Sequence, residues 1–453
     1  LSLYVNDSFV ETVTVTDNIA TFTATDFNPG DVVRVDGAST SDTFTFTDYS
    51  EEYVFTTNGN WNEATNWTPT GPGAADNVTI NAACTIPATY TAQTNNITFG
   101  ENGSLTIADG GQLIHNNEDV VATVEKNITA YTVNQNEGES LTDGWYFIAS
   151  PITDDYTPTG SMVENTYDLY RLNPTTTRWE NDKNTTGHSD FTKLNNGAGY
   201  LYANSAETTL SFTGTLKPYA ASESVSVSTG WNLIGNPFTY NVYANRSFYR
   251  MNEAKTGVEA VSTFSTSPIA PCTGIVVEAE TDGNVIFSKE VPSQSQGNNN
   301  SLQIALSQTN TRNNALLDKA IVSFNEDNQL GKFYFGTQNA NIYIPQNGKD
   351  YAIVSSEAQG EMPVNFKARE NGTYTITVNA EDVEMGYLHL IDYMTGADID
   401  LLALRPHSTG SGTEAQGPAS YTFTAKTTDY ESRFKLVFFA NEDGPSTGSG
   451  AFA

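Results

Sequence analysis

The chain has 453 residues, which is enough for about three or four domains that each bury a core. Acidic residues outnumber basic residues by 53 to 21, and the formal net charge of −32 disfavours binding to nucleic acid or anionic lipid, which carry the same sign. No run approaches the roughly 18 apolar residues of a membrane-spanning helix, so we expect none. Charged residues make up only 16% of the chain, whereas Thr, Asn, Ser and Gly are abundant, which favours strands and turns.

Residues 1–56 alternate apolar and polar side chains, as half-buried strands do. The pattern predicts about four to six short strands, which would make a small or partial β-sandwich. Leu1 already lies within an alternating run and no signal peptide precedes it. We therefore expect the chain to be a processed or truncated fragment.

Residues 57–128 contain short apolar runs that recur about every 8–12 residues between Gly, Asp and Asn turns. The runs lie at 78–80, 84–86, 97–99, 105–107 and 113–114. This spacing predicts a short β-solenoid with Asn-rich corners, because Asn tolerates the left-handed backbone conformation. Trp61 and Trp67 precede the runs, and we predict that they cap or enter the solenoid core. The alternative is that both rings form a platform for a sugar.

Residues 129–291 contain one pattern twice. Gly-Trp-Tyr-Phe-Ile-Ala-Ser-Pro at 144–151 matches Gly-Trp-Asn-Leu-Ile-Gly-Asn-Pro at 230–237. The match continues downstream in the pairs Tyr170-Arg171-Leu172 with Tyr249-Arg250-Met251, Gly199–Ala203 with Gly274–Glu278, and Phe212 with Phe287. These blocks in one order predict a duplicated β domain, with copies at about 144–215 and 230–290. Because neither copy has an obvious core of its own, we expect the copies to pack on each other.

The polar run 292–301 predicts a linker, and the strand-like alternation that follows at 302–441 predicts one C-terminal β-sandwich. Within it, the segment 405–419 is rich in Gly and Ser, which predicts a hairpin loop or an inserted flexible stretch. Residues 442–453 have the composition of a tail or linker. The predicted fold is therefore all-β: tandem β-sandwich modules with a short β-solenoid segment and a duplicated β unit.

The sequence contains no motif that points to catalysis. It has no nucleophile elbow, phosphate-binding loop or dinucleotide fingerprint. None of the four histidines has a metal-ligand spacing; they are His115, His188, His389 and His407. Cys84 and Cys272 fall in different predicted domains, so two buried thiols are favoured over a disulfide. We therefore predict no enzyme activity and no catalytic residues.

Two ligand sites are candidates in the first copy. Oxygen-rich loops there suit calcium, with Asp182 and Asp190 as candidate ligands, although no Asp-x-Asp-x-Asp-Gly loop is present. Calcium is the only cofactor that the sequence suggests. For a glycan, the candidates are Trp179, Tyr200 and Tyr202, because aromatic faces stack on sugars. The alternative is that these three rings belong to the core of the repeat.

Three features resemble secreted and cell-surface proteins of Bacteroidota. They are the Asn-Trp…Asn-Trp…Asp-Asn-Val-Thr-Ile entry at 60–80, the Gly-Trp-x-Leu/Phe-Ile-x-x-Pro pair, and the C-terminal blocks 387–402, 421–425 and 433–438. The last blocks resemble the sandwich that precedes the sorting domain of type IX secretion cargo. That sorting domain is not in the sequence, and its expected place lies after Ala453. The resemblance implies export across the outer membrane and surface attachment or release, and it supplies no catalytic residues.

The residues and the resemblance together predict a non-enzymatic, extracellular or outer-membrane surface-attached protein. It would be a modular, acidic β stalk for adhesion, assembly or glycan or protein binding. The expected partners are a host or bacterial surface glycan or protein, or neighbouring copies of the chain itself. The alternative is the accessory binding or spacer portion of a secreted polysaccharide-active or proteolytic enzyme, with its catalytic domain encoded before Leu1.

Overall fold

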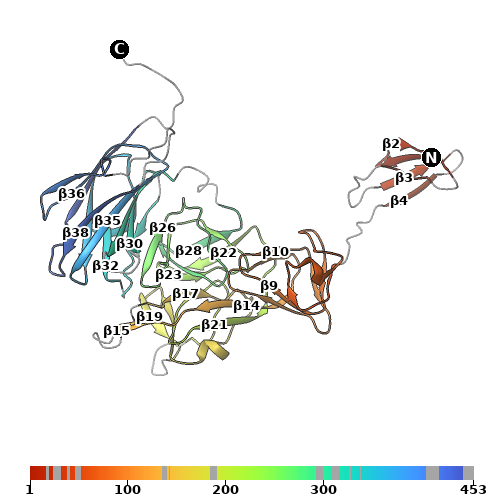
Figure 1. Ribbon diagram of the computed structural model, residues 1–453, viewed down its shortest axis with the longest axis horizontal. Coiled ribbons are helices and arrows are strands. Elements are labelled where there is room, and N and C mark those ends of the chain that lie inside the picture. Colours follow the sequence, from red (N-terminus) through yellow and green to blue (C-terminus); the bar gives the residue numbers. More distant parts are fainter. Residues whose placement is uncertain are drawn as a thin grey trace, which may run out of the picture.

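The computed structural model describes residues 1–16, 20–23, 32–37, 41–45, 53–134, 140–141, 143–183, 191–291, 299–308, 316–325, 328–336, 338–404 and 418–441. The fold is all-β, as predicted: the only helices in these ranges are two short 3-10 helices, Ala64–Asn66 and Gly160–Val163. A solenoid, two repeats and a C-terminal sandwich follow one another along the chain (Figure 1).

The N-terminal residues form a four-stranded antiparallel sheet in the order β2-β1-β3-β4. Its strands are β1 (Ser2–Val5), β2 (Ser8–Thr12), β3 (Val32–Asp36) and β4 (Ser41–Thr45). The predicted end of this module at residue 56 is wrong, because β5 (Tyr53–Phe55) pairs in parallel with a solenoid strand. Phe55 is fully buried in the solenoid core, where its ring lies 5.0 Å from that of Trp67. Burial of this ring assigns β5 to the solenoid.

The solenoid is built from strands stacked on three faces; its rungs pair in parallel, and only β7 (Trp67–Thr68) at the start runs antiparallel to its neighbour β5. One face holds β5, β7, β8 (Val78–Ile80) and β11 (Ile97–Phe99); the second holds β6 (Gly59–Asn60), β9 (Ala83–Ile86), β12 (Ser104–Ile107) and β14 (Val121–Ile128); the third holds β10 (Thr91–Gln93) and β13 (Gln112–Ile114). Val78 pairs with Ile97 and Cys84 pairs with Leu105, so each coil takes about 20 residues. The predicted β-solenoid is confirmed.

Asparagine side chains connect the coils at one corner of the solenoid. The amides of Asn95 and Asn96 both donate to Asn77 Oδ1, at 3.0 and 2.9 Å, and Asn116 donates to Asn95 Oδ1 at 3.1 Å. Asn117 closes the last edge, because its amide donates to Ile97 O and its Oδ1 accepts from Ile97 N, both at 2.9 Å. Backbone groups that would otherwise stay unpaired are therefore bonded by a side chain.

The two tryptophans at the start of the solenoid belong to its core, as predicted. Trp61 and Trp67 are only 2% and 3% exposed, and their rings meet edge to face at 4.8 Å. Trp67 Nε1 donates to Trp61 O at 2.7 Å, which satisfies the indole inside the core. Neither face is open to solvent, so the alternative of a sugar platform is wrong.

The duplication is confirmed by strand order. The first copy has the order β17-β20-β18-β19 and the second has β23-β27-β25-β26. The strands are β17 (Tyr146–Ala149), β18 (Tyr167–Asn173), β19 (Arg178–Asn181) and β20 (Gly199–Asn204), against β23 (Gly230–Gly235), β25 (Phe248–Met251), β26 (Val258–Val261) and β27 (Gly274–Ala279). An ion pair also recurs: Arg171 Nε lies 2.6 Å from Glu180, and Arg250 Nε lies 2.7 Å from Glu259.

Each copy begins one strand earlier than predicted. In the first copy β14 pairs with β21 (Thr208–Thr215), and in the second β22 (Ser222–Val227) pairs with β28 (Gly283–Ser288). β14 also pairs with β12, so one sheet continues from the solenoid into the first copy. The predicted boundary at residue 128 therefore crosses a continuous sheet. Short strand pairs complete the region: β15 (Val133–Asn134) with β16 (Ser140–Leu141), and β24 (Tyr243–Ala244) with β28.

The two copies pack on each other through reciprocal contacts, as expected. Ile148 of the first copy bridges Thr273 of the second, and the equivalent Ile234 bridges Ala198. Such mutual exchange of equivalent positions is what a two-fold interface produces. The approach is close: a Cβ on Gly235 would lie 2.2 Å from the Cβ of Ala149, its own counterpart in the first copy. One of these two equivalent positions must therefore be glycine.

The C-terminal module is a β-sandwich whose strands enclose one core. They are β29 (Ser301–Gln308), β30 (Leu316–Ser323), β31 (Leu330–Gly331), β32 (Ala340–Gln346), β33 (Lys349–Ser355), β34 (Gln359–Ala368), β35 (Gly372–Glu381), β36 (Met385–Asp392), β37 (Ala397–Asp400), β38 (Ala419–Ala425) and β39 (Phe434–Ala440). In this core Arg433 Nη2 lies 2.8 Å from Asp392, and both side chains are buried. Of the predicted linker, Ser301 already belongs to β29. Residues 292–298, most of the predicted 405–419 insertion and the tail 442–453 lie outside the described residues.

Candidate binding groove between the repeats

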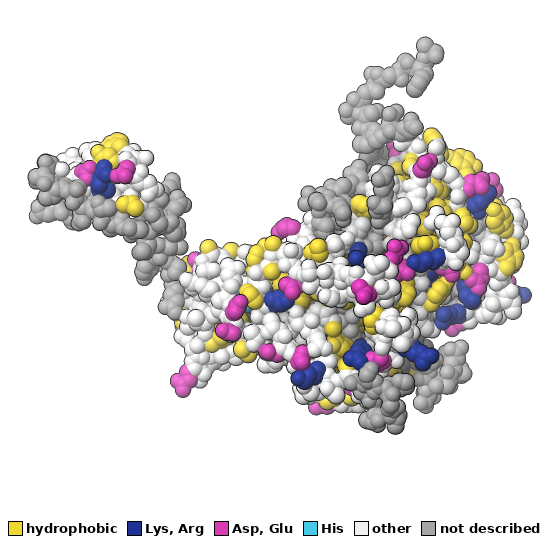
Figure 2. All heavy atoms as spheres, turned by 180° about the vertical axis from the view of Figure 1, so that it is seen from behind, with side chains coloured by type: hydrophobic (Ala, Val, Ile, Leu, Met, Phe, Trp, Pro, Cys, Tyr) yellow, Lys and Arg dark blue, Asp and Glu magenta, His cyan; other side chains and the backbone are white. Residues whose placement is uncertain are grey.

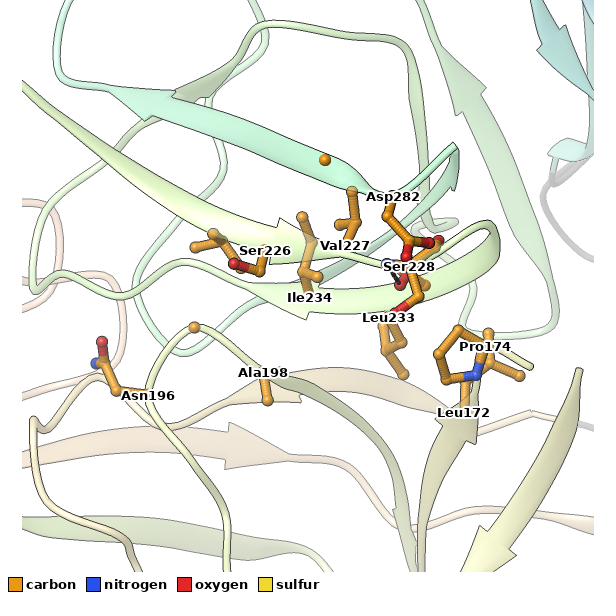
Figure 3. A pocket seen from close by; sticks show the side chains of 14 residues that line it. Leu172, Pro174, Asn196, Ala198, Ser226, Val227, Ser228, Leu233, Ile234 and Asp282 are labelled. Carbon is orange, nitrogen blue, oxygen red and sulfur yellow. Dashed lines mark hydrogen bonds between the residues drawn. The ribbon is translucent and has the colours of Figure 1, made fainter. Parts of the chain in front are cut away.

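A groove of about 610 Å³ lies where the second copy meets the first (Figure 3). Its upper wall is the C-terminal half of β22 with the turn at 282–283, and β23 lies below them. The opposite wall comes from the first copy, from residues 172–174 and 196–198. The wall is mixed: Leu172, Val227 and Leu233 are apolar, whereas Asn196 and Asn232 are polar. The volume falls within the range of about 300–1,000 Å³ that is typical of ligand pockets.

One asparagine shapes the turn between β22 and β23. Asn232 Oδ1 accepts from Ser228 N at 2.9 Å, and its amide donates to Ser228 O at 2.6 Å and to Gly230 O at 3.0 Å. Gly230 has φ +102°, and a Cβ there would lie 2.9 Å from Pro174 O. The turn is therefore fixed from inside by Asn232, and glycine allows its close approach to the first copy.

Asp282 supplies the only charged side chain among the residues that line this groove. Its Oδ1 accepts hydrogen bonds from Thr229 N at 2.7 Å and from Thr229 Oγ1 at 3.0 Å. These bonds stabilise the carboxylate and hold the pKa of Asp282 below its ordinary value. The groove therefore has a fixed negative charge at its rim near neutral pH.

The backbone of β22 presents an edge beside the groove. Ala221 O accepts from Lys289 N at 3.0 Å, so Ala221 faces β28, and alternate residues along the strand do the same. The N–H and C=O groups of Ser222, Ser224 and Ser226 then point away from β28; we call this side the outer edge of β22. Among the described strands none pairs with it, since the sheet order is β22-β28-β24.

A second hollow, of about 460 Å³, lies at the other end of the same strand. It is lined by Glu223 of β22, by Tyr219 and Lys217 just before the strand, and by Thr153 of the first copy. Lys217 Nζ lies 2.9 Å from Glu223 Oε1, so these two charges neutralise each other. The two hollows together flank β22 from its N-terminal to its C-terminal end.

Two of the three aromatic residues predicted to bind glycan are core residues. Tyr200 and Tyr202 lie on β20 and are 2% and 0% exposed. Tyr202 OH donates to Met162 O at 2.9 Å, and burial raises the pKa of Tyr202 to about 12. Neither ring has a face open to a sugar, so the prediction for both is wrong. The alternative, that they form the repeat core, is correct.

Trp179, the third candidate, is half-buried at the contact with the C-terminal sandwich. Its ring lies 6.5 Å from that of Phe335, which also meets Trp145 at 6.4 Å and Phe147 at 6.1 Å. The equivalent contact of the second copy uses Phe333, at 5.0 Å from Trp231. The sequence analysis did not find this cluster; the run Phe333-Tyr334-Phe335 is aromatic throughout and lies outside the strands, so no alternation marked which rings are buried.

Of the two predicted calcium ligands, the structure describes only Asp182. Asp182 Oδ2 accepts from Tyr167 OH at 3.0 Å, and burial raises the pKa of Asp182. Asp190 lies outside the described residues. Within the parts of the chain that the structure describes, no group of three or more His, Cys, Asp or Glu residues could hold a metal ion. The calcium site stays a prediction.

The remaining reactive side chains are sealed or solvated. Cys84 and Cys272 are buried free thiols, as predicted, and burial raises the pKa of Cys84 to about 12. His115 is 1% exposed, and burial lowers its pKa, so it is neutral near pH 7. His389 stacks on Tyr387 at 4.1 Å on the outer face of β36. The other two histidines, His188 and His407, lie outside the described residues.

Over the described residues, no helix is long and apolar enough to cross a membrane. Comparison with known proteins found no matching family, no matching curated protein and no matching solved structure.

Proposed function

We propose that the chain is a non-enzymatic extracellular scaffold, a β stalk that presents binding surfaces for adhesion or assembly. The observation that carries this proposal is that the solenoid, the repeats and the sandwich are joined by packed interfaces. Domains linked only by a flexible segment move relative to one another, whereas a large apolar interface holds them in one orientation. A stalk needs the second arrangement.

The contact between the repeats and the sandwich has an aromatic centre. Phe333 and Phe335 are 6% and 4% exposed, and each inserts between rings of one copy. Tyr249 OH donates to Gly331 O at 2.9 Å and accepts from Phe333 N at 3.1 Å, which satisfies the buried hydroxyl. A buried ring cluster with its polar atoms bonded fixes both position and orientation.

Polar side chains extend the same contact on both sides of the rings. Asn328 donates to Ser262 Oγ at 2.8 Å and accepts from Ser247 Oγ at 2.6 Å. Gln338 Nε2 donates to Val258 O of the second copy at 3.1 Å and to Leu317 O of the sandwich at 3.0 Å. These bonds are buried, so breaking the interface would expose or orphan several polar groups.

The solenoid is joined to the repeats by backbone bonds. β12 pairs with β14, and Leu113 N donates to Thr239 O of the second copy at 3.0 Å. Thr239 Oγ1 donates back to Leu113 O at 2.9 Å. The solenoid therefore contacts both copies, and among the described residues from β5 to β39 each module is braced by the next.

The charge and the resemblance support an extracellular location. The net charge of −32 favours solubility and keeps copies apart. On the face in Figure 2, acidic and basic side chains are interspersed and do not form a basic patch. The resemblance to type IX secretion cargo agrees with export to the cell surface, where the partner would be a surface glycan or protein.

Surface labelling and attachment assays on the producing cells test this function. An antibody against the chain should label intact cells, and a deletion strain should lose attachment to glycan- or protein-coated surfaces. The purified chain should leave polysaccharides and peptides uncleaved. Recovery of the chain only from the cytosol, unchanged attachment of the deletion strain, or release of reducing ends or new amino groups would each contradict the proposal.

A further inference from the structure

The duplication allows one edge of the molecule to be compared with its own counterpart. Val124 of β14 pairs with Phe212, and Glu223 of β22 pairs with Phe287. Because Phe212 and Phe287 are equivalent residues of the two copies, Val124 corresponds to Glu223 and Thr123 corresponds to Ser222. The outer edge of β22 is therefore the counterpart of the β14 edge that faces the solenoid.

In the first copy this edge is covered by a strand. β12 runs parallel to β14, with Thr106 opposite Thr123 and Ile107 opposite Val124. In the second copy no described strand occupies the corresponding position. The backbone donors and acceptors of this edge are thus bonded in one copy and have no described strand partner in the other, where Ser226 at the end of the edge lines the larger hollow.

From this difference we infer that the outer edge of β22 binds an extended peptide segment of a partner protein as an added parallel strand. This mode of binding uses backbone hydrogen bonds for affinity and flanking side-chain pockets for specificity. Ser222, Ser224 and Ser226 supply the bonds, and the two hollows receive side chains at the two ends of the peptide. For the proposed scaffold, the partner would then be a protein with an extended peptide segment. Only this link to a biological partner rests on the proposed function.

The direction of the covering strand distinguishes a peptide from a second copy of the chain. Ser222, Ser224 and Ser226 are exposed, so the edge itself is accessible. In the first copy the strand that covers the equivalent edge is parallel to β14. Two copies related by a two-fold axis would join equal edges in the antiparallel direction, so the parallel arrangement calls for a separate extended segment.

The chemistry of the peptide follows from the walls and from the strand that fills the counterpart. β12 has the sequence Ser-Leu-Thr-Ile, which alternates apolar and polar residues. The apolar wall formed by Val225, Val227 and Leu233 favours the same alternation. Asp282 has no ion-pair partner among the described residues and precedes Gly283, which pairs with Val227 at the end of β22. In the parallel orientation a Lys or Arg near the C-terminal end of the peptide therefore meets Asp282.

A fluorescent peptide with the sequence Ser-Leu-Thr-Ile-Ala-Thr-Ala-Lys is a direct probe for the full chain, because in the register of β12 on β14 its Ile stands opposite Glu223 and its Lys opposite Val227, beside Asp282. We expect saturable binding in fluorescence polarisation, and about tenfold weaker binding when Ser224 is changed to Pro, because the ring removes one outward N–H and blocks the edge. Ser224 does not donate to β28, so Ser224→Pro should retain the unfolding temperature of the parent. Ser224→Ala keeps the N–H and should bind as the parent does.

The charge is tested separately by Asp282→Asn, which should reduce binding of the lysine peptide to that of a peptide ending in Ala-Ala. Absence of saturable binding, equal binding by Ser224→Pro, or a parent dimer that Ser224→Pro abolishes in sedimentation would each overturn the inference. Because the assay uses purified chain and peptide, its failure is distinct from failure of the scaffold function. That function is tested by cell attachment.

Discussion

Phe335 is the residue whose truncation tests the rigid stalk most directly. It belongs to the sandwich by sequence but is buried among Trp145, Phe147 and Trp179 of the first copy. Replacing a buried Phe by Ala costs about 3–5 kcal/mol when the cavity does not collapse. Three ring contacts at about 0.5–1.5 kcal/mol each account for a large part of that cost. The loss falls on the interface between modules and leaves the sandwich core in place.

The assay follows from where the energy is lost. In the parent, the shared interface should couple the repeats and the sandwich so that they unfold together in urea. In Phe335→Ala we expect two separated transitions, because the sandwich retains its own core while the repeats lose a stabilising contact. Small-angle scattering under native conditions should show a larger radius of gyration as the sandwich swings away from the repeats.

Phe439→Ala is the matched control, because it removes the same ring from β39 of the same module. Phe439 is 43% exposed, so its truncation should cost less than about 1 kcal/mol and leave the scattering profile unchanged. If Phe335→Ala kept a single transition and the parental radius of gyration, the stalk would not depend on this interface. Equal effects of the two variants would likewise refute the reasoning, since burial would then not explain the loss.

Three further predictions concern the duplicated interface, the buried ion pair and the solenoid edge. Gly235→Ala should destabilise by about 1–3 kcal/mol, because its Cβ would lie 2.2 Å from Ala149 Cβ and 2.8 Å from Ala198 O. Ala149→Gly in the same chain relieves only the first clash and should restore part of the loss in a urea double-mutant cycle; no coupling would disprove the reciprocal packing. Burial alone would raise the pKa of Asp392, but its bonds to Arg433 outweigh burial and leave the pKa below its ordinary value. This pair therefore stabilises the fold above the unfolded pKa of about 4, and the free energy of unfolding should fall as the pH drops through the folded pKa. Asp392→Asn should lower the free energy of unfolding by about 3–5 kcal/mol and should flatten the dependence of the unfolding temperature on pH. Asn117→Ala should uncover the edge of β11 at Ile97 and lower the unfolding free energy by about 1–3 kcal/mol, with Asn116→Ala, which loses one exposed bond, as the milder control.

The sequence predicted the features that repeat in it. The solenoid runs are regular, and the Gly-Trp-x-x-Ile pattern marks corresponding strands, so both the rungs and the duplication could be found without coordinates. The sequence did not predict that the two copies include β14 and β22, which precede the predicted starts at about 144 and 230. β14 reads Val-Ala-Thr-Val-Glu-Lys-Asn-Ile and β22 reads Ser-Glu-Ser-Val-Ser-Val, and only their pairing with equivalent strands shows the correspondence.

The prediction that Tyr200 and Tyr202 bind glycan was wrong because both side chains are buried. Every residue of β20 is buried, because Tyr200 and Tyr202 face the core shared with the solenoid while Leu201 and Ala203 face the sandwich contact. A strand covered on both faces has no alternation from which an exposed face could be inferred. The neighbouring modules that cover it are distant in sequence, so local pattern alone could not reveal that Tyr200 and Tyr202 are inaccessible.

The two copies keep the same internal construction and differ in what covers their first strand. The equivalent ion pairs Arg171–Glu180 and Arg250–Glu259 have nearly the same length and exposure, so both copies maintain one strand geometry. Because the geometry is shared, the difference between β14 and β22 comes from their neighbours: the solenoid is bonded to one edge, and no described strand pairs with the other. A duplicated unit that uses one edge to attach a module therefore retains a second, preformed edge of the same kind. The Ser224→Pro variant tests whether that second edge also pairs with a strand.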